Sequence, residues 1–314
     1  MQVPAKIVYV LLAAGLLAAC QPVLDEAVPA VVEQHPQERK SNRIYYIVPT
    51  DVQYGDYLTF MDTLVEAING IWSGYLNEYD LVQYNPWVMD TLARTDYYDL
   101  RDRGRVVRIL DTLTILRQGD TLNVPARTDL LQLAAMRKAT RLEVNLPEFK
   151  LRVLRSDSLI FDFPVRVGQD RAKFLAMAER EVDLKTKTGV GRVVRVNKKP
   201  MFINPANNHR YYQTSRDDGI ITSLPRVPWL ITEINGVEHG QLIHPTTNLE
   251  TLGKTYSNGC IGTRESDAWY IYYYAPPGTP LTICYQLSRI TPEGDTLIFR
   301  DIYGRGTRGL VNCE

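Results

Sequence analysis

A cysteine in the last fifth of the chain has the local sequence of a thiol nucleophile. Cys260 follows Asn258 and Gly259, which tolerate left-handed backbone, and Gly259 has no side chain to shield the sulfur. Such a nucleophile also needs a base and amide donors for the oxyanion. A helix predicted directly after the turn offers exposed amides to an anion there. The alternative is a half-buried structural thiol, which is the commoner state of a lone cysteine.

Histidine is a common base for such a thiol, and the chain contains His35, His209, His239 and His244. His35 lies in a tether-like segment. His239 and His244 are five residues apart, so on one strand they would face opposite sides. His244 ends the apolar stretch 241–243 and precedes a proline, a position typical of active sites. The sequence therefore favours His244 as the base, with His209, in a polar loop, as the weaker rival.

The four cysteines are Cys20, Cys260, Cys284 and Cys313. They include no C-x-x-C pair, and no His/Cys cluster has zinc spacing, so the sequence predicts no metal site and no cofactor. If Cys20 carries a lipid, three cysteines remain, and one of them is unpaired unless it bonds to another chain. A disulfide between Cys284 and Cys313 and a buried free thiol at Cys284 both remain open.

The N-terminus indicates export. Residues 1–19 contain Lys6 followed by 13 apolar residues, too few to span a bilayer but enough for a signal-peptide core. The sequence before Cys20 resembles the lipobox of bacterial lipoproteins, so we expect lipidation of Cys20 and a flexible tether over residues 20–43. The alternative is an ordinary secretory signal. With this lipid, we expect the protein in the bacterial cell envelope, anchored to the outer membrane and facing the periplasm.

The charges of the chain are balanced. Its 314 residues contain 36 Lys plus Arg and 36 Asp plus Glu, whereas nucleic-acid binders usually have a basic excess. Nucleic acid is therefore not an expected partner. The length allows two modest domains after the N-terminus is discounted.

Residues 44–140 predict a small α+β domain. Residues 45–48 favour a strand, and residues 56–68 have apolar side chains at helical spacing that ends at Asn69-Gly70. Residues 113–124 alternate around a Gln-Gly-Asp turn, which predicts a hairpin.

Residues 141–286 are rich in predicted strands. Apolar side chains alternate in three successive segments, which predicts half-buried antiparallel strands. One helix is expected over residues 265–275, where a Pro-Pro-Gly sequence stops it. Residues 287–314 predict one further hairpin. The expected strands of the larger region are 142–146, 149–153, 161–167, 192–196, 241–244 and 281–285.

This part of the chain resembles the L,D-transpeptidase catalytic domain, also called the YkuD or ErfK family. That family has a histidine followed 13 residues later by Ser-His-Gly-Cys, and His244 and Ser257 have this spacing. The segment 257–261 matches the motif at four of five positions. Upstream segments at 144–151, 163–168 and 187–191 resemble the family's first strands and its Thr-Gly turn.

The resemblance implies a mainly β chain, with an L,D-transpeptidase-like β-sandwich catalytic domain over 141–286 and one short helix after the nucleophile. The small α+β domain precedes it. Two segments of that domain, 54–58 and 119–125, also resemble the start and end of a LysM glycan-binding module, although their spacing is longer. The alternative is a domain that packs against the rest of the protein and has no assigned ligand.

The resemblance also assigns roles to residues. Cys260 is the nucleophile and His244 the base, and the two form a thiolate–imidazolium pair. The motif turn around the oxyanion consists of Ser257, Asn258 and Gly259. Tyr256 and Arg264 are the candidates for substrate contacts, and Arg264 is otherwise a surface residue at a helix start.

Three residues depart from the family pattern. Asn258 replaces the motif histidine, Pro245 replaces the glycine after the base, and Gly262 replaces the Arg or Asn two positions after the cysteine. Proline keeps the carbonyl that would orient the imidazole. The loss at Gly262 removes the expected substrate anchor, a role that Arg264 is the candidate to fill.

The activity implied is acyl transfer on peptidoglycan. Cys260 attacks a tetrapeptide stem, terminal D-Ala leaves, and the acyl group passes to an amine, which gives a 3–3 crosslink or attaches a protein. The partners are thus donor and acceptor stem peptides, with the membrane contacted through the lipid. Two alternatives remain: an L,D-carboxypeptidase or hydrolase that uses the same site, and a catalytically inert wall-binding lipoprotein.

Overall fold

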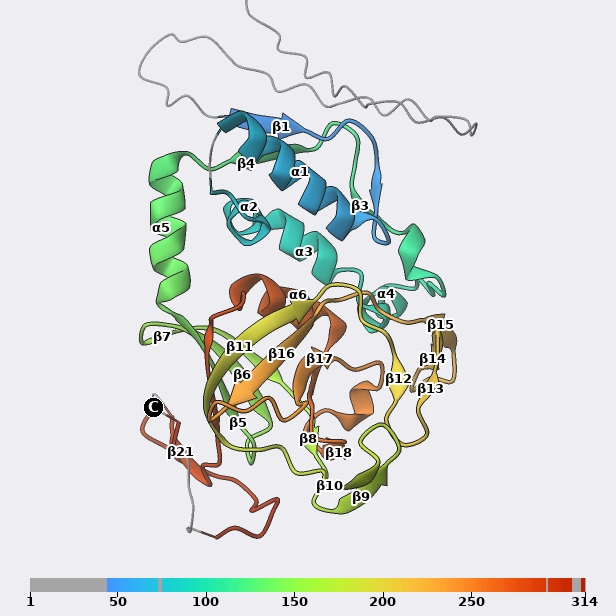
Figure 1. Ribbon diagram of the computed structural model, residues 1–314, viewed down its shortest axis with the longest axis vertical. Coiled ribbons are helices and arrows are strands. Elements are labelled where there is room, and N and C mark those ends of the chain that lie inside the picture. The colour runs from blue at the N-terminus through green and yellow to red at the C-terminus, as the bar shows by residue number, and fades with distance from the viewer. Residues whose placement is uncertain (1–43, 73–74, 292, 307–311, 314) are drawn as a thin grey trace, which may run out of the picture.

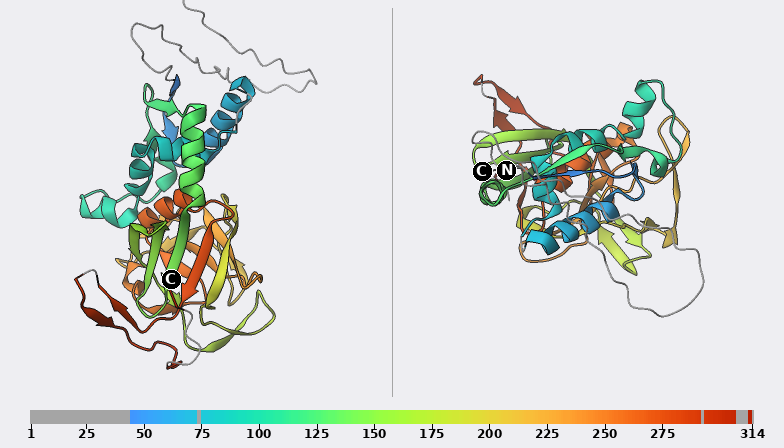
Figure 2. Two further views of the ribbon diagram at one scale, coloured as in Figure 1. Left: turned by 90° about the vertical axis from the view of Figure 1, so that its left-hand side faces the viewer. Right: turned by 90° about the horizontal axis from the view of Figure 1, so that it is seen from above.

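The computed structural model describes residues 44–72, 75–291, 293–306 and 312–313. The predicted signal peptide, the tether, Cys20 and His35 lie outside these residues. The described chain has an N-terminal helical part that stands on a larger part built around a β-sheet (Figures 1 and 2). Helix α5 (Arg127–Lys138) runs from the first part to the second and leads directly into the sheet. None of the helices in the described residues is long and apolar enough to cross a membrane.

The N-terminal part combines short helices with two small two-stranded sheets, so the expected α+β region is confirmed. Its other elements are β1 (Ile44–Ile47), β2 (Val52–Gln53), α1 (Tyr57–Trp72), α2 (Glu78–Tyr84), α3 (Trp87–Ala93), α4 (Tyr97–Asp102), the 3-10 turn η1 (Leu110–Thr112), β3 (Thr114–Leu116) and β4 (Thr121–Val124). The resemblance of this part to a LysM glycan-binding module stays a prediction.

Two predictions for this part were wrong. Strands β3 and β4 do not form a hairpin, because β3 pairs with β2 and β4 pairs with β1. Helix α1 does not end at Asn69-Gly70 but continues to Trp72. The side chain of Asn69 instead bonds the amide and the carbonyl of Leu76, at 3.0 and 2.8 Å, so it holds the chain that follows the helix.

The larger part contains an eight-stranded mixed sheet with the order β19-β17-β16-β11-β20-β5-β6-β7. Three of these strands, β5, β6 and β7, form the antiparallel run that the alternating pattern predicts. The sheet is mixed, since β20 pairs parallel with β5 and β17 pairs parallel with β19. The strands are β5 (Thr140–Asn145), β6 (Lys150–Arg155), β7 (Ser158–Pro164), β11 (Gly189–Asn197), β16 (Trp229–Ile234), β17 (Leu242–Pro245), β19 (Ile261–Thr263) and β20 (Pro280–Cys284).

Short ribbons surround this sheet, and the mainly β class is confirmed. They are β8 (Val167–Gly168), β9 (Ala172–Leu175), β10 (Arg180–Asp183), β12 (Ile203–Asn204), β13 (His209–Arg210), β14 (Gln213–Ser215), β15 (Ile221–Ser223), β18 (Thr255–Ser257), β21 (Ser288–Ile290) and β22 (Thr296–Ile298), with the 3-10 turn η2 (Leu249–Thr251). The predicted C-terminal hairpin corresponds to β21 and β22, which pair antiparallel.

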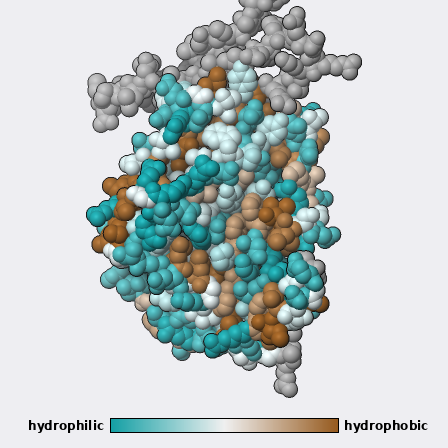
Figure 3. All heavy atoms as spheres, turned by 180° about the vertical axis from the view of Figure 1, so that it is seen from behind, coloured by the Kyte–Doolittle hydropathy of each residue, from teal (hydrophilic) through white to brown (hydrophobic). Residues whose placement is uncertain are grey.

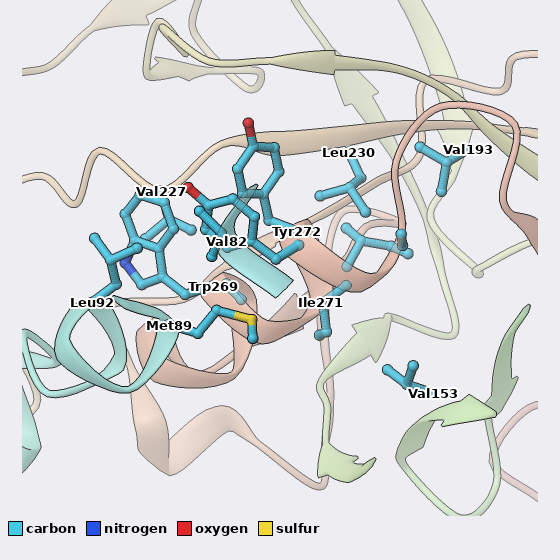
Figure 4. Close-up of a cluster of buried hydrophobic side chains, with 14 of the residues drawn as sticks. Val82, Met89, Leu92, Val153, Val193, Val227, Leu230, Trp269, Ile271 and Tyr272 are labelled. Carbon is cyan, nitrogen blue, oxygen red and sulfur yellow. The ribbon is translucent and has the colours of Figure 1, made fainter. Parts of the chain in front are cut away.

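Helix α6 (Glu265–Tyr274), the one predicted after Cys260, joins the two parts of the molecule. Figure 4 shows its side chains Trp269, Ile271 and Tyr272 among side chains from the N-terminal helices on one side and from the sheet on the other. The Tyr273 hydroxyl meets the Tyr57 hydroxyl of α1 at 2.7 Å. The helix is apolar on most faces because it is enclosed on most faces. One continuous hydrophobic core therefore holds the N-terminal part against the eight-stranded sheet.

The surface keeps its exposed apolar side chains in separate patches. Figure 3 shows such patches, coloured brown, interrupted by hydrophilic residues over one face of the molecule. Scattered apolar residues of this kind are normal on a folded protein and do not by themselves mark a binding site.

Candidate functional site

His244 lies in β17 and Cys260 immediately precedes β19, the neighbouring strand at one edge of the sheet. Parallel pairing of β17 with β19 places His244 opposite Gly262, two residues after Cys260. Because side chains two residues apart share a face of a strand, Cys260 and His244 are diagonal neighbours on one face. The sheet register thus places the predicted nucleophile and base on one face of two neighbouring segments.

The ring of His244 has a defined orientation. Its Nδ1 lies 2.9 Å from the carbonyl oxygen of Pro245, and since a carbonyl only accepts, Nδ1 carries the proton. Trp229 of β16 packs against the ring, with centroids 5.1 Å apart. The carbonyl that the sequence expects to orient the imidazole is therefore the one that does so. Nε2 is left as the basic nitrogen.

The surroundings of Cys260 and His244 shift both pKa values toward the neutral forms. Burial raises the pKa of the Cys260 thiol, opposed by a backbone hydrogen bond from Leu242 and by the charge of Arg166. Burial and Arg166 together lower the pKa of His244 to about 4, against the bond to Pro245. Both shifts disfavour the thiolate–imidazolium pair in the free protein, and the pair that the resemblance implies stays a prediction for the reaction. The proton stays on sulfur until a substrate or another anion-stabilising contact arrives.

These shifts predict the pH dependence of alkylation. A raised thiol pKa leaves little thiolate at neutral pH, and an imidazole with a pKa of about 4 stays uncharged above it. Alkylation of Cys260 by iodoacetamide in the free protein should therefore speed up steadily from about pH 6 to about pH 9. Peptide mapping of the alkylated protein measures this rate at Cys260. A rate that is already at its plateau below about pH 6 would instead indicate a preformed ion pair.

The motif turn is held by its own serine. The Ser257 hydroxyl donates to the carbonyl of Cys260 at 2.5 Å and accepts from the amide of Gly259 at 3.2 Å. Gly259 has φ of +111°, a conformation that favours glycine. Asn258 is exposed at the tip of this turn. Since the Gly259 amide is bonded to Ser257, it is not one of the oxyanion donors that the resemblance implied.

Arg166 is a site residue that sequence reasoning missed. It forms a two-way backbone bridge with Gly262, with N–O distances of 2.9 and 3.0 Å. Its side chain fills the space beside Gly262, because a Cβ there would lie 2.6 Å from Nε and 2.8 Å from Cγ of Arg166. Glycine at this position is thus required by the arginine that lies over it. The missing side chain at Gly262 was the signal in the sequence that another residue occupies its place.

The guanidinium of Arg166 retains unused hydrogen-bonding capacity. One nitrogen, Nη1, donates to the Thr251 hydroxyl at 3.1 Å, whereas Nε is buried without a hydrogen-bond partner among the described residues. Burial lowers the pKa of Arg166, and the nearby Cys260 thiol opposes this. The charge of Arg166 also acts on His244. A cation with free donors therefore stands beside both predicted catalytic groups.

The other candidates for substrate contacts have different surroundings. Arg264 pairs with Asp99 at 2.6 Å and with Asp96 at 3.7 Å, both from the N-terminal part, so its guanidinium is committed to the contact between the parts. Asp96 also accepts from the amide of Ser266 at 3.1 Å, which occupies an amide at the start of α6. Tyr256 is 53% exposed and near enough to Arg166 for their charges to interact. Tyr256 is therefore the candidate that remains at the mouth of the site.

A tyrosine from the C-terminal extension supports the nucleophile turn from behind. The Tyr303 hydroxyl donates to the carbonyl of Gly168 at 2.8 Å and accepts from the Thr186 amide at 3.2 Å. The Thr186 hydroxyl in turn donates to the Gly259 carbonyl at 3.0 Å. The extension is tied to the sheet by a disulfide between Cys284 and Cys313, so one of the alternatives left open by the sequence is settled. Tyr303 therefore reaches the residue before Cys260 through one intermediary.

Replacing Tyr303 by phenylalanine should lower the free energy of unfolding by about 1–3 kcal/mol, because two buried partners lose their hydrogen bond. Chemical denaturation measures this change. Tyr75→Phe is the matched control, since Tyr75 is 94% exposed and its loss should have little effect. Equal stability of the two variants would show that the buried hydroxyl makes no net contribution.

The remaining described histidines lie apart from this site. His209 is in β13 and exposed, and His239 is exposed in the turn before β17. Within the described residues, no group of three or more His, Cys, Asp or Glu side chains is arranged to hold a metal ion.

The part of the chain that contains the sheet also matches a known family model. The model of the YkuD family, described as the L,D-transpeptidase catalytic domain, matches residues 139–283. This part of the chain is therefore similar to the L,D-transpeptidase catalytic domain. No curated protein matches the chain.

Solved structures similar to the chain are also L,D-transpeptidases. One from Mycobacterium tuberculosis H37Rv is 16% identical with a TM-score of 0.30, over 46% of this chain and 57% of that one. A mutant enzyme from Enterococcus faecium is 15% identical with a TM-score of 0.29, over 46% and 49%. One from Xylanimonas cellulosilytica is 13% identical with a TM-score of 0.34, over 75% and 98%. The chain thus spans less than two thirds of the first two structures.

Proposed function

We propose that the protein is a cysteine-dependent peptidoglycan L,D-transpeptidase. The observation that carries this proposal is the convergence of Cys260, His244 and Arg166 on one face of β17 and β19. The donor is a tetrapeptide stem and the acceptor is an amine of a second stem. The product is a 3–3 crosslink.

In the first half-reaction, Nε2 of His244 takes the thiol proton as the sulfur of Cys260 attacks the carbonyl of the third stem residue. A carbon–sulfur bond forms, and the carbonyl oxygen takes up the negative charge. Collapse of this intermediate breaks the bond to terminal D-Ala. The D-Ala amine leaves with the proton from His244, so the histidine returns to its neutral state.

In the second half-reaction, an acceptor amine gives its proton to His244 and attacks the thioester carbon. The new amide bond forms as the carbon–sulfur bond breaks. The released sulfur recovers its proton from the imidazole, and the enzyme returns to the neutral pair described above. Water in place of the amine would give the shortened stem of a carboxypeptidase.

The electrostatics suit a nucleophile that is activated only when substrate is bound. Burial disfavours charge on both Cys260 and His244, so the thiolate is costly in the free protein. Arg166 favours the thiolate, and its unpaired Nε is available to a carboxylate or an oxyanion. We propose that this guanidinium anchors the donor stem, in place of Arg264.

The decisive experiment is the intact mass of the protein after incubation with a carbapenem, followed by product analysis on muropeptides. A single covalent adduct that maps to Cys260, together with crosslinked dimers, supports the transpeptidase. Shortened monomers without dimers would support the hydrolase. Absence of any adduct at neutral pH would favour the inert wall-binding lipoprotein.

We also propose that the protein is tethered in the cell envelope, with lipid on Cys20 and its catalytic part facing the periplasm. The support is the signal-like sequence of residues 1–19 and the lipobox-like sequence before Cys20. Incorporation of labelled palmitate into the wild-type protein but not into Cys20→Ala tests this. Equal incorporation would contradict it.

A further inference from the structure

A cleft opens between the N-terminal part and the catalytic part. It has a volume of about 460 Å³. Gly55, Leu58, Thr59 and Asp111 line it from the N-terminal part, and the segment 198–226 lines it from the other side. The site described above does not include any of these residues.

The wall of the cleft packs against the aromatic side chain that covers His244. Phe202, which lines the cleft, packs edge-on against Trp229 with centroids 4.9 Å apart, and Trp229 packs against His244. Tyr211 also lines the cleft, and the charge of Arg166 opposes the rise of its pKa that burial causes. Phe202 is thus separated from His244 by one side chain, and Tyr211 is close enough to Arg166 for their charges to interact.

The walls combine apolar surface with cations. Lys198 and Arg226 pair with acidic residues, Lys198 with Asp62 and Arg226 with Asp111. Lys199 and Arg210 are exposed and make no ion pair among the described residues. The guanidinium of Arg210 lies over the ring of Tyr212, 4.8 Å from its centroid. A ligand with both carboxylates and apolar groups fits such walls.

The chemistry of the second half-reaction decides which ligand belongs here. The incoming amine must give up its proton to His244, so it must approach from the histidine side of the thioester. The cleft lies on that side, with Phe202 and Trp229 between it and His244, whereas Arg166 covers the strand beside Cys260. An anionic peptide that carries the amine would lie in the cleft with its carboxylates near the two unpaired cations.

We propose that this cleft between the two parts binds the acceptor stem peptide, with Lys199 and Arg210 holding its carboxylates. This inference rests on the proposed transpeptidase function. The N-terminal part is then a component of the acceptor site and not only a support for α6. Tyr212 and Met201, exposed at 67% and 57%, form the apolar rim.

The test is the steady-state kinetics of crosslinking in the full-length protein, with a tetrapeptide donor and a separate amine acceptor stem. The double variant Lys199→Gln/Arg210→Gln should raise the acceptor KM by about tenfold or more, with a far smaller change in the rate of D-Ala release. The charge-matched control is Lys138→Gln/Arg127→Gln on α5, at exposed positions outside the cleft. The control should keep the wild-type acceptor KM.

A second pair of variants tests the contribution of the N-terminal part. Thr59→Trp places a bulky side chain in the cleft from α1, and should likewise raise the acceptor KM. Thr63→Trp puts the same side chain one turn further along α1, at an exposed position that does not line the cleft. It should leave the acceptor KM at the wild-type value.

The outcomes separate this inference from the proposed function. Wild-type protein that forms neither thioester nor crosslink would contradict both. Wild-type crosslinking with an unchanged acceptor KM in the double variant and in Thr59→Trp would overturn the cleft assignment alone. Equal losses of D-Ala release and of crosslinking in these variants would overturn it too, because the cleft would then serve the donor.

Discussion

Replacing His244 by alanine should slow acylation of Cys260 by about 10²–10⁴-fold at neutral pH, the usual contribution of a positioned general base. The effect is expected to be large because burial raises the pKa of the thiol, so little thiolate forms without help. The same variant should retain its fold, since the ring makes one hydrogen bond, to Pro245. Stopped-flow measurement of carbapenem acylation, with adduct mass as the second readout, gives the rate.

His239→Ala is the matched control for this experiment. His239 lies on the exposed turn before β17, and its loss should leave the acylation rate within about twofold of wild type. If His239→Ala and His244→Ala slow acylation equally, the assignment of the base is wrong. Raising the pH should partly restore His244→Ala, because hydroxide then generates the thiolate that the imidazole no longer provides.

Removing the guanidinium at Arg166 should lower kcat/KM for the donor by roughly 10–100-fold, the effect of losing a hydrogen bond from a charged group. Arg166→Ala should also move two pKa values: that of the thiol should rise further, and that of His244 should rise from about 4. Nuclear magnetic resonance titration of the imidazole measures the second change. A residue that only packs would not produce it.

A swap of positions tests whether the charge or the backbone position matters. Gly262→Arg alone should also reduce activity, because its Cβ would lie within 2.6 Å of the Arg166 side chain. Combined with Arg166→Ala, the same substitution regains both space and charge and should recover part of the lost acylation. Strictly additive losses in this double-mutant cycle would refute the idea that the two positions share one guanidinium site.

Much of the catalytic sheet was predictable because its strands have one buried face. The alternation in β5, β6 and β7 gives the right elements, and the helix after Cys260 ends at the expected Pro-Pro-Gly stop. Strand direction was not predictable in the same way. An alternating pattern reports which side chains are buried, and it does not distinguish a parallel partner such as β19 from an antiparallel one.

The N-terminal part was harder to predict for a related reason. Helices α2, α3 and α4 have seven, seven and six residues, too short to establish a helical period. Strands β3 and β4 flank a good turn, but each gains more by pairing with a strand before α1 than with the other. Local turn chemistry was overridden by tertiary pairing.

In the candidate site, spacing located Cys260 and His244 but not their surroundings. Sequence distance does not report burial, so the neutral state of the pair was not predictable from the motif. Arg166 was missed for the same reason: it lies on a different segment, and only the fold places its side chain over Gly262. The role expected of Arg264 depended on a side chain that the N-terminal carboxylates already hold.

The disulfide between Cys284 and Cys313 makes the number of free thiols differ between the native and the reduced, unfolded protein. Cys260 is the one free thiol among the described residues, so a maleimide should label this region once in the native form and three times after full reduction and unfolding. Dithiothreitol added to keep Cys260 from oxidising acts on the same chemistry that fastens the tail carrying Tyr303. Purification without reductant, under mild acid where thiols oxidise slowly, therefore suits this protein better than the usual thiol buffer.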